Sequence, residues 1–256
     1  MNVVPFDLTG LRVAITAGAG GIGRVIADSF AACGARPFVS DVDVAALAAC
    51  GHAGVLADAG RADALDRFMD AAAASLGGLD VLVNNAGIAG PTKPVEEVTP
   101  AELDAVLQTD LASMFHCARR AIPMLREAGG GSIVNLSSAA GKFGFPLRSP
   151  YSASKWGVIG FTRTLAMEVG PDRIRVNAIL PGLVDGPRIR SVLRNKAHAK
   201  GVGDNEETEQ ALTRVNLRCF VSQQDIANMA LYLSSPFGTT ISGQAISVDG
   251  GMESLG

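Results

Sequence analysis

The chain has 256 residues, of which 48% are hydrophobic and 18% charged, and its formal net charge is −3 at pH 7. This composition indicates a folded protein with a large buried core and excludes a mainly disordered chain. The slightly acidic balance gives no reason to expect nucleic-acid binding, and no run of 18 or more apolar residues suggests membrane insertion.

The cysteines and histidines do not have the spacing of a metal site. They are scattered as Cys33, Cys50, Cys117, Cys219, His52, His116 and His198. We expect reduced cysteines in the core of a metal-free protein. The first seven residues lack a basic segment followed by an apolar run, so we expect a cytoplasmic protein without a secretory signal.

The first elements predict a nucleotide site. An apolar run over residues 11–16 ends in the glycine-rich stretch 17–23, and a helical pattern follows over 24–33, with Gly34 as its stop. Glycines let a backbone approach a pyrophosphate, and a helix N-terminus offers free amides and a partial positive charge. A tight turn without a ligand is the plain alternative.

The second expected strand ends in an acidic residue. Residues 37–40 are mainly apolar and lead to Asp41, 18 residues after Gly23 (41 − 23). A carboxylate at this place can accept a hydrogen bond from a ribose 2′-hydroxyl, and its charge repels a 2′-phosphate. Asp41 therefore predicts NAD rather than NADP as the cofactor.

Strands and helices alternate along the rest of the chain. The expected strands are 55–57, 79–83, 132–137, 174–180 and 245–248, and the expected helices are 61–76, 101–127, 151–169 and 223–234. Thr99 and Glu102 have the spacing of a capping box before the second of these helices. Residues 181–222 form a long polar segment. The alternation predicts one α/β domain over residues 1–256, a Rossmann-type doubly wound parallel sheet of about seven strands flanked by helices.

Three polar side chains form a candidate catalytic set. Ser138 follows the expected strand 132–137, and Tyr151 and Lys155 lie four residues apart, on one face of the next helix. A nearby ammonium favours the phenolate form of a tyrosine, so Tyr151 could exchange a proton while Ser138 steadies a substrate oxygen. The spacing alone is weak evidence, because a packed tyrosine and a solvated lysine would show it too.

Together these residues resemble the classical short-chain dehydrogenase/reductase family over essentially the whole chain. The motifs that carry the resemblance are residues 16–23, Asp58, residues 84–87, Ser138, Tyr151-x-x-x-Lys155, residues 181–182 and residues 249–251. Several independent motifs in the right order make this match specific.

The resemblance implies roles for individual residues. Tyr151 would be the general acid and base, Lys155 would assist it and hold the nicotinamide ribose, and Ser138 would stabilise the carbonyl or alkoxide oxygen. The implied cofactor contacts, besides Asp41, are Gly18, Gly20, Gly21, Ile22, Asp58 at the adenine, Asn84 at the adenosine ribose, Tyr151, Lys155 and Val184 at the carboxamide. The family also implies a homo-oligomer, a dimer or a tetramer.

The sequence departs from the family pattern at three places. Ala17 replaces the glycine that usually follows the threonine of the turn, and no threonine stands four residues after Pro181-Gly182. The third departure is Asp110, at the place of an asparagine that holds the proton relay together. We expect Asp110 to lie near Lys155; an aspartate that faces solvent or caps a helix irregularity is the alternative.

A basic stretch suggests an anionic substrate. Its members are Arg188, Arg190, Arg194, Lys196 and Lys200, and the resemblance places them in a substrate lid around residues 185–222. We expect Arg188 or Arg148 to pair with a carboxylate, sulfonate or phosphate of the substrate. The alternative is a solvated helix face whose charge is balanced by the acidic residues between 204 and 209.

The sequence thus favours an NAD(H)-dependent oxidoreductase that acts on a secondary alcohol or ketone. A non-catalytic dinucleotide-binding scaffold or sensor is the main alternative, since a fold does not determine a function. A serine hydrolase is excluded, because no G-x-S-x-G elbow follows a strand.

Overall fold

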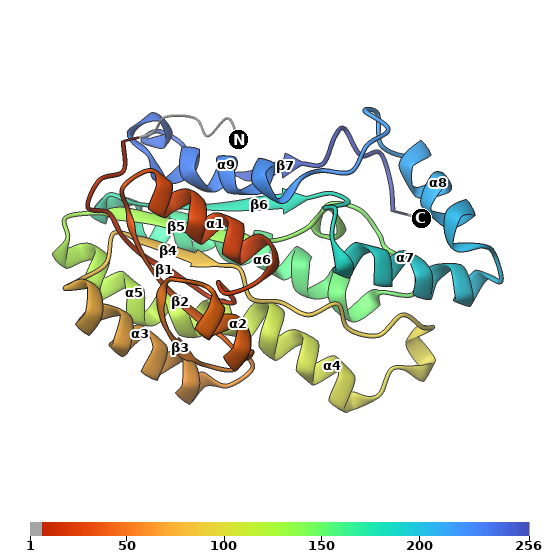
Figure 1. The fold of residues 1–256 in the computed structure, drawn as a ribbon, viewed down its shortest axis with the longest axis horizontal. Coiled ribbons are helices and arrows are strands. Elements are labelled where there is room, and N and C mark those ends of the chain that lie inside the picture. The colour runs from red at the N-terminus through yellow and green to blue at the C-terminus, as the bar shows by residue number, and fades with distance from the viewer. Residues whose placement is uncertain (1–6, 256) are drawn as a thin grey trace.

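Seven parallel strands form one sheet in the order β3-β2-β1-β4-β5-β6-β7 in the computed structural model, which describes residues 7–255 (Figure 1). They are β1 (Arg12–Ile15), β2 (Arg36–Asp41), β3 (Ala53–Leu56), β4 (Val81–Asn84), β5 (Gly131–Leu136), β6 (Ile174–Pro181) and β7 (Ala245–Val248). Each neighbouring pair runs parallel. The predicted doubly wound parallel sheet of about seven strands is confirmed.

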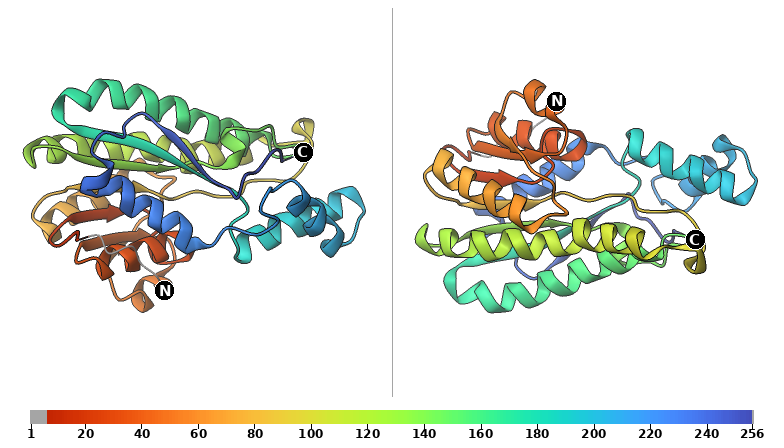
Figure 2. Two further views of the ribbon diagram at one scale, coloured as in Figure 1. Left: turned by 90° about the horizontal axis from the view of Figure 1, so that it is seen from above. Right: turned by 90° about the horizontal axis from the view of Figure 1, so that it is seen from below.

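Helices cover both faces of this sheet, as the views from above and from below show (Figure 2). The α-helices are α1 (Gly21–Ala32), α2 (Val44–Ala49), α3 (Ala62–Leu76), α4 (Pro100–Leu107), α5 (Ser113–Glu127), α6 (Ser149–Val169), α7 (Pro187–Lys200), α8 (Asp204–Thr213) and α9 (Gln223–Ser234). Side chains alternate across each strand, so the two faces have separate cores. Val13 and Ile15 pack with α1 and α9, whereas Ala14 packs with α3 and α5.

The strand order places a crevice at the middle of the sheet. The chain winds outward from β1 to β3 on one side and then returns to β4, which pairs with the other edge of β1. In open parallel sheets, ligands bind where the winding reverses, beyond the carboxyl ends of the strands. The segments after β1, β4, β5 and β6 meet there.

The long polar segment, residues 181–222, contains two helices. Helix α7 begins at Pro187, which is favourable in a first helical turn, and ends before Gly201 at φ +69°. The sequence gives little helical periodicity here, because few apolar residues lie on the buried face of α7, which includes Lys196. The short helix α2 was also missed; the Asp43 carboxylate caps it by accepting from the amides of Ala45 and Ala46.

The expected continuous helix over 101–127 is broken in its first half. Helix α4 starts with the predicted capping box, in which Thr99 and Glu102 bond reciprocally. A π-helical segment, Gln108–Ala112, then separates α4 from α5. Such a turn is wider than an α-helical turn and is often found at functional sites. Asp110 lies inside it and is buried.

The glycine-rich turn has one strained residue. Ala17 has φ +51°, in the left-handed region that costs a residue with a Cβ atom about 1–2 kcal/mol. Gly23 cannot be replaced, because a Cβ there would lie 2.1 Å from the Ala17 carbonyl oxygen. Gly18 has a packing role, since a Cβ there would lie 2.7 Å from Val39. The glycine that is usual at position 17 would adopt this positive φ without strain.

We expect Ala17→Gly to raise the free energy of unfolding by up to about 1 kcal/mol, because glycine removes the left-handed strain but loses more backbone entropy. Ala19→Gly, two residues along the same turn, is the matched control. Ala19 is buried and has no positive φ, so its variant should lose about 1 kcal/mol. Urea unfolding measures both; equal losses in the two variants would disprove the strain at Ala17.

Candidate active site

A cavity of about 320 Å³ opens at the carboxyl ends of the central strands. One group of predicted residues lines its nucleotide end: Gly20, Gly21, Ile22 and Asp41. A second group lines the rest: Ser138, Arg148, Tyr151, Lys155, Val184 and Arg188. The sequence-predicted residues that do not line the cavity are Gly18, Asp58, Asn84 and Asp110. The structure therefore brings together most of the candidate site.

The start of α1 has the features of a phosphate cradle. Its N-cap, Gly20, has no side chain to bond the first amides of the helix, and these amides are near the cavity. A Cβ on Gly20 or Gly21 would meet no atom within 4 Å, so the space above the turn is open. Free amides at a helix N-terminus and an open approach suit a pyrophosphate.

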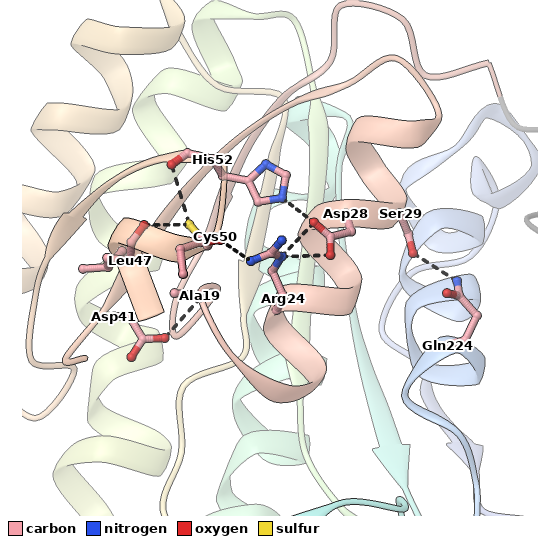
Figure 3. Close-up of polar contacts among 10 residues, drawn as sticks. Ala19, Arg24, Asp28, Ser29, Asp41, Leu47, Cys50, His52 and Gln224 are labelled. Atoms are coloured by element: carbon pink, nitrogen blue, oxygen red, sulfur yellow. Dashed lines mark hydrogen bonds and ion pairs between the residues drawn. The ribbon is translucent and has the colours of Figure 1, made fainter. Parts of the chain in front are cut away.

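Asp41 forms the acidic rim of this cradle. One of its carboxylate oxygens accepts from the Ala19 amide at 3.1 Å, as Figure 3 shows, and the other accepts from the Val42 amide at 2.8 Å. These bonds fix the carboxylate at the end of β2 while leaving it partly exposed to the cavity. A carboxylate at this place can accept hydrogen bonds from ribose hydroxyls.

The basic residue of α1, Arg24, is paired with an acidic residue. Arg24 binds both carboxylate oxygens of Asp28 through its Nε, and His52 also contacts Asp28, at 2.7 Å (Figure 3). Burial favours the neutral acid, but the hydrogen bonds from His52 and Arg24 outweigh it and hold the pKa of Asp28 below its usual value. Arg24 is thus engaged within its own helix.

The two asparagines after β4 have different surroundings. The Asn84 side chain donates to Asn135 at 2.8 Å, and Asn135 donates to Thr162 at 2.9 Å, so Asn84 belongs to a buried chain of hydrogen bonds. Asn85 lines the cavity instead and bonds the carbonyls of Thr16 and Ala17, both at 3.0 Å. The Asn84 side chain is buried and bonded inside the sheet and does not line the cavity, so its contact with the adenosine ribose stays a prediction.

Asp58, expected at the adenine, is an exposed residue outside the cavity. Its carboxylate accepts from the Gly60 amide at 2.8 Å, which shapes the turn after β3. Val184, expected at the carboxamide, lines the cavity and forms a parallel bridge with Val221. That bridge holds the backbone after β6 next to the segment that precedes α9.

Lys155 is buried beside Tyr151. Its Nζ donates to the Leu136 carbonyl at 3.0 Å and lies 3.5 Å from the Asp110 carboxylate. The same nitrogen lies 5.6 Å from the centre of the Tyr151 ring. Lys155 is therefore not the solvated lysine of the plain alternative, and its positive charge stands next to the phenol.

Ser138, the third member of the candidate catalytic set, lies after the end of β5. Its Oγ accepts from the Ala140 amide at 3.1 Å. A hydroxyl that accepts one bond can still donate its own proton, and Ser138 lines the cavity together with Tyr151. The pair can present two polar hydrogens to one substrate oxygen.

Asp110 reaches this group from the π-helical segment. It is fully buried; one carboxylate oxygen accepts from the Ile88 amide at 2.7 Å, and the other has no hydrogen-bond partner. The second oxygen is the one 3.5 Å from Lys155 Nζ. The expected proximity of Asp110 and Lys155 is observed, and the solvent-facing alternative is wrong.

Arg148 is a buried cation at the start of α6. It is 2% exposed, donates through Nη2 to the Ala89 carbonyl, and lies 4.9 Å from the centre of the Tyr151 ring. Its Nε and Nη1 have no hydrogen-bond partner. Burial lowers the pKa of Arg148 because the charged form is partly desolvated. Arg188, on α7, is exposed and donates to the Gly87 carbonyl.

Comparison with known proteins identifies the family. Residues 16–253 match the family model described as Enoyl-(Acyl carrier protein) reductase. The chain is 31% identical to a D-beta-hydroxybutyrate dehydrogenase of Rhizobium meliloti (strain 1021), with 93% of this chain and 96% of the relative covered. The chain belongs to the classical short-chain dehydrogenase/reductase family. The predicted resemblance is confirmed.

Two solved structures of this family superpose on almost the whole chain. Levodione reductase matches with a TM-score of 0.90 and 29% identity, over 95% of this chain and 97% of that one. A single-residue variant of actinorhodin polyketide ketoreductase with NADPH matches with a TM-score of 0.89 and 31% identity, over 94% and 97%. Members of this oxidoreductase family bind a nicotinamide dinucleotide and act on alcohols and ketones. Among residues 7–255, no helix has the length and hydrophobicity needed to cross a bilayer.

Sequence reasoning missed several residues that line the cavity. Phe145 and Leu255 line its substrate side, and Asn85 lines its nucleotide side. Asn85 had a signal, since it is the second asparagine of a predicted strand-end pair. Phe145 and Leu255 had none, because they come from an irregular loop and from the end of the chain. Cys219 was expected in the core and is exposed.

Asp110→Asn tests the relay. We expect an active enzyme whose pH profile of kcat/KM for alcohol oxidation moves to lower pH, because a neutral amide removes a negative charge that opposes formation of the Tyr151 phenolate. Asp104→Asn makes the same charge change at an exposed site of α4 and should leave the profile unchanged. An unchanged profile in Asp110→Asn, or a move to higher pH, would contradict the assignment.

Proposed function

We propose that this protein is an NAD(H)-dependent oxidoreductase that moves a hydride between the nicotinamide and a secondary alcohol or ketone, with an anionic group on the substrate. The observation that carries the proposal is the presence of Ser138, Tyr151 and Lys155 on one cavity with the open glycine-rich turn. When bound, the nicotinamide supplies or accepts the hydride.

The residues of the chain supply binding, orientation and a proton. In ketone reduction the Tyr151 hydroxyl gives its proton to the substrate oxygen, and in alcohol oxidation the phenolate takes that proton back. Ser138 donates a hydrogen bond to the same oxygen and stabilises the charge that develops on it. The Lys155 ammonium stabilises the phenolate, and Asp110 with the Leu136 carbonyl holds that ammonium in place.

Asp41 supports NAD(H) as the preferred cofactor. Its carboxylate is fixed at the rim of the cradle, and Gly20 offers no basic side chain there. Arg24 is already paired with Asp28. A 2′-phosphate would therefore meet a negative charge without a free cation. A similar ketoreductase structure contains NADPH, so membership in the family does not by itself determine which of the two cofactors is preferred.

Arg148 supports an anionic substrate. Burying a guanidinium leaves two of its nitrogens without partners, which is unfavourable unless another group satisfies them. A carboxylate can accept two parallel hydrogen bonds from a guanidinium, and Arg148 lies beside Tyr151 on the cavity. A relative in sequence is named for hydroxybutyrate, which is itself a carboxylate. Arg188, on the lid, is the second candidate.

A panel of neutral and anionic ketones with NADH tests the reaction directly. We expect NADH oxidation with at least part of the panel and formation of the matching alcohol. NADH binding without turnover of any ketone, and without oxidation of the corresponding alcohols by NAD, would instead support the non-catalytic scaffold or sensor.

We also propose that the protein forms a dimer or tetramer. Helices α5 and α6 expose large apolar side chains, with Phe115 49%, Trp156 53% and Met167 82% exposed. Gly157 packs against Leu111 within the chain, whereas Gly160 has open space beside it for another helix. Light scattering on the purified protein measures the molar mass, and a monomer would overturn this proposal.

Cofactor preference should depend on Asp41. We expect the wild-type protein to prefer NADH over NADPH by about 10- to 100-fold in kcat/KM, equivalent to about 1–3 kcal/mol. Asp41→Asn should reduce this preference at least several-fold, since it removes the repulsive charge. Asp43→Asn, an exposed change two residues away, should shift it much less. Equal efficiency with both cofactors in the wild type would contradict the proposal.

The role of Arg148 can be separated from general damage by comparing two substrates. We expect Arg148→Met to raise KM for a keto acid at least about tenfold, the scale of one charge-assisted hydrogen bond. The efficiency with the neutral amide of the same keto acid should change by less than about threefold. Arg190→Met, on an exposed arginine paired with Asp185, is the control. Equal losses with both substrates would exclude an anion-binding role.

A further inference from the structure

A charged cluster with two buried members joins the two lid helices. The Glu207 carboxylate of α8 is fully buried, and Lys200 of α7 donates to it at 2.8 Å. Lys196 Nζ lies 3.5 Å from the other carboxylate oxygen, and its side chain is only 6% exposed. Acidic residues therefore do pair with the basic stretch as expected, but one of them, Glu207, is buried inside the protein. We refer to Lys196, Lys200 and Glu207 as the lid cluster.

The lid cluster reaches the last segment of the chain. Lys196 Nζ donates to the Leu255 carbonyl at 2.8 Å, and this bond is buried. Leu255 also lines the active-site cavity. In Figure 1, α7 and α8 lie at the same end of the molecule as the segment that follows β7. One ammonium thus ties α7, α8 and the end of the chain together.

The cluster also contacts the loop that leads into the catalytic helix. Lys196 Nζ lies 5.3 Å from the centre of the Phe145 ring, and the Arg148 guanidinium lies 5.1 Å from the same centre. Arg148 in turn lies 4.9 Å from the centre of the Tyr151 ring. A ring close to two cations is held by both of them. The side chains Lys196, Phe145, Arg148 and Tyr151 form a continuous series from lid to reaction centre.

A second cavity beside the lid cluster shares lining residues with the active-site cavity. This small cavity, of about 20 Å³, is lined by Lys196 and by Phe145 and Leu255. Phe145 and Leu255 line the active-site cavity as well, and so do three further residues of the second cavity, Leu183, Ile189 and Val192. Residues that line both cavities form the wall between them, and such a wall shifts when its support moves, because interiors are close-packed.

We propose that the lid cluster is a positioning device that fixes the wall made by Phe145 and Leu255 and thereby limits the length of substrate that the cavity accepts. This inference rests on the proposed function. Burying the charges of Lys196 and Glu207 is unfavourable unless their geometry is well satisfied, so the cluster has few alternative arrangements. Lys196 and Glu207 act through the wall and make no contact with the reacting atoms.

Lys196→Met in the full chain is the main test, with NADH and keto acids of increasing chain length. We expect kcat/KM for the shortest productive keto acid to fall about five- to twentyfold, mainly because KM rises. The value of kcat should stay within about threefold of wild type, since loss of the buried charge-assisted bond of Lys196 alters the cavity wall and not the reacting groups. The preferred chain length should increase by about two carbons. Glu207→Gln, which keeps the side-chain shape, should shift the preference in the same direction.

Arg194→Met is the matched control. Arg194 lies on the same helix, but its pair with Asp204 is long, at 3.7 Å, and both side chains are more than half exposed. We expect this variant to keep the wild-type chain-length profile, because exposed pairs contribute little. A shift in Arg194→Met equal to that in Lys196→Met would mean that net lid charge sets the profile, and it would overturn the inference.

Hydrogen–deuterium exchange supplies a readout that does not need turnover. In Lys196→Met and Glu207→Gln, amides of residues 249–255 should exchange at least about tenfold faster than in wild type, while those of α1 should not change. If wild type reduces no keto acid but exchange responds as described, the anionic substrate of the proposed function fails, whereas the link between the lid cluster and residues 249–255 stands. If wild type is active and both variants keep its length profile and its exchange, the inference is wrong.

Discussion

The burial of one positive charge organises the site. An ammonium removed from water needs oxygen partners close by, and Lys155 obtains them from two separate elements. The Leu136 carbonyl is at the end of β5, and the Asp110 carboxylate comes from the π-helical segment between α4 and α5. The sheet, the catalytic helix and the irregular helix must therefore meet at this one nitrogen, which fixes where Tyr151 stands.

The same constraint explains why Asp110 lies in irregular structure. A regular helix over 101–127 would carry its residues past the end of β4 in a different orientation, whereas the wider π-helical turn brings the carboxylate to Lys155 and to the Ile88 amide. Gly87 leaves room for this contact, because a Cβ there would lie 3.3 Å from both Asp110 Oδ1 and Lys155 Nζ. The Asp110 carboxylate offsets one of the two cations beside Tyr151, Lys155 and Arg148, and this negative charge distinguishes the chain from the family pattern with asparagine.

Sequence reasoning was most successful where local spacing decides the geometry. Tyr151 and Lys155 share a helix face because they are four residues apart, and Ser138 and Asp41 follow strands whose ends meet at one edge of the sheet. Sequence reasoning failed where contacts between distant segments determine the position of a side chain. Nothing near Asn84 indicates that Asn135 and Thr162 satisfy its side chain, and nothing in the polar segment 181–222 shows that Glu207 is buried. The same holds for Phe145 and Leu255, which become neighbours only when the lid packs.

The most direct measurement combines binding and turnover in Tyr151→Phe, which removes one hydroxyl and keeps the ring beside Arg148 and Lys155. If Tyr151 is the proton donor, the variant binds NADH with a Kd within about threefold of wild type and loses ketone reduction by about 10²- to 10⁴-fold. With wild type, NADH deuterated at the transferring position should place deuterium on the alcohol carbon. A Tyr151→Phe variant that reduces ketones at more than about a tenth of the wild-type rate would contradict the account.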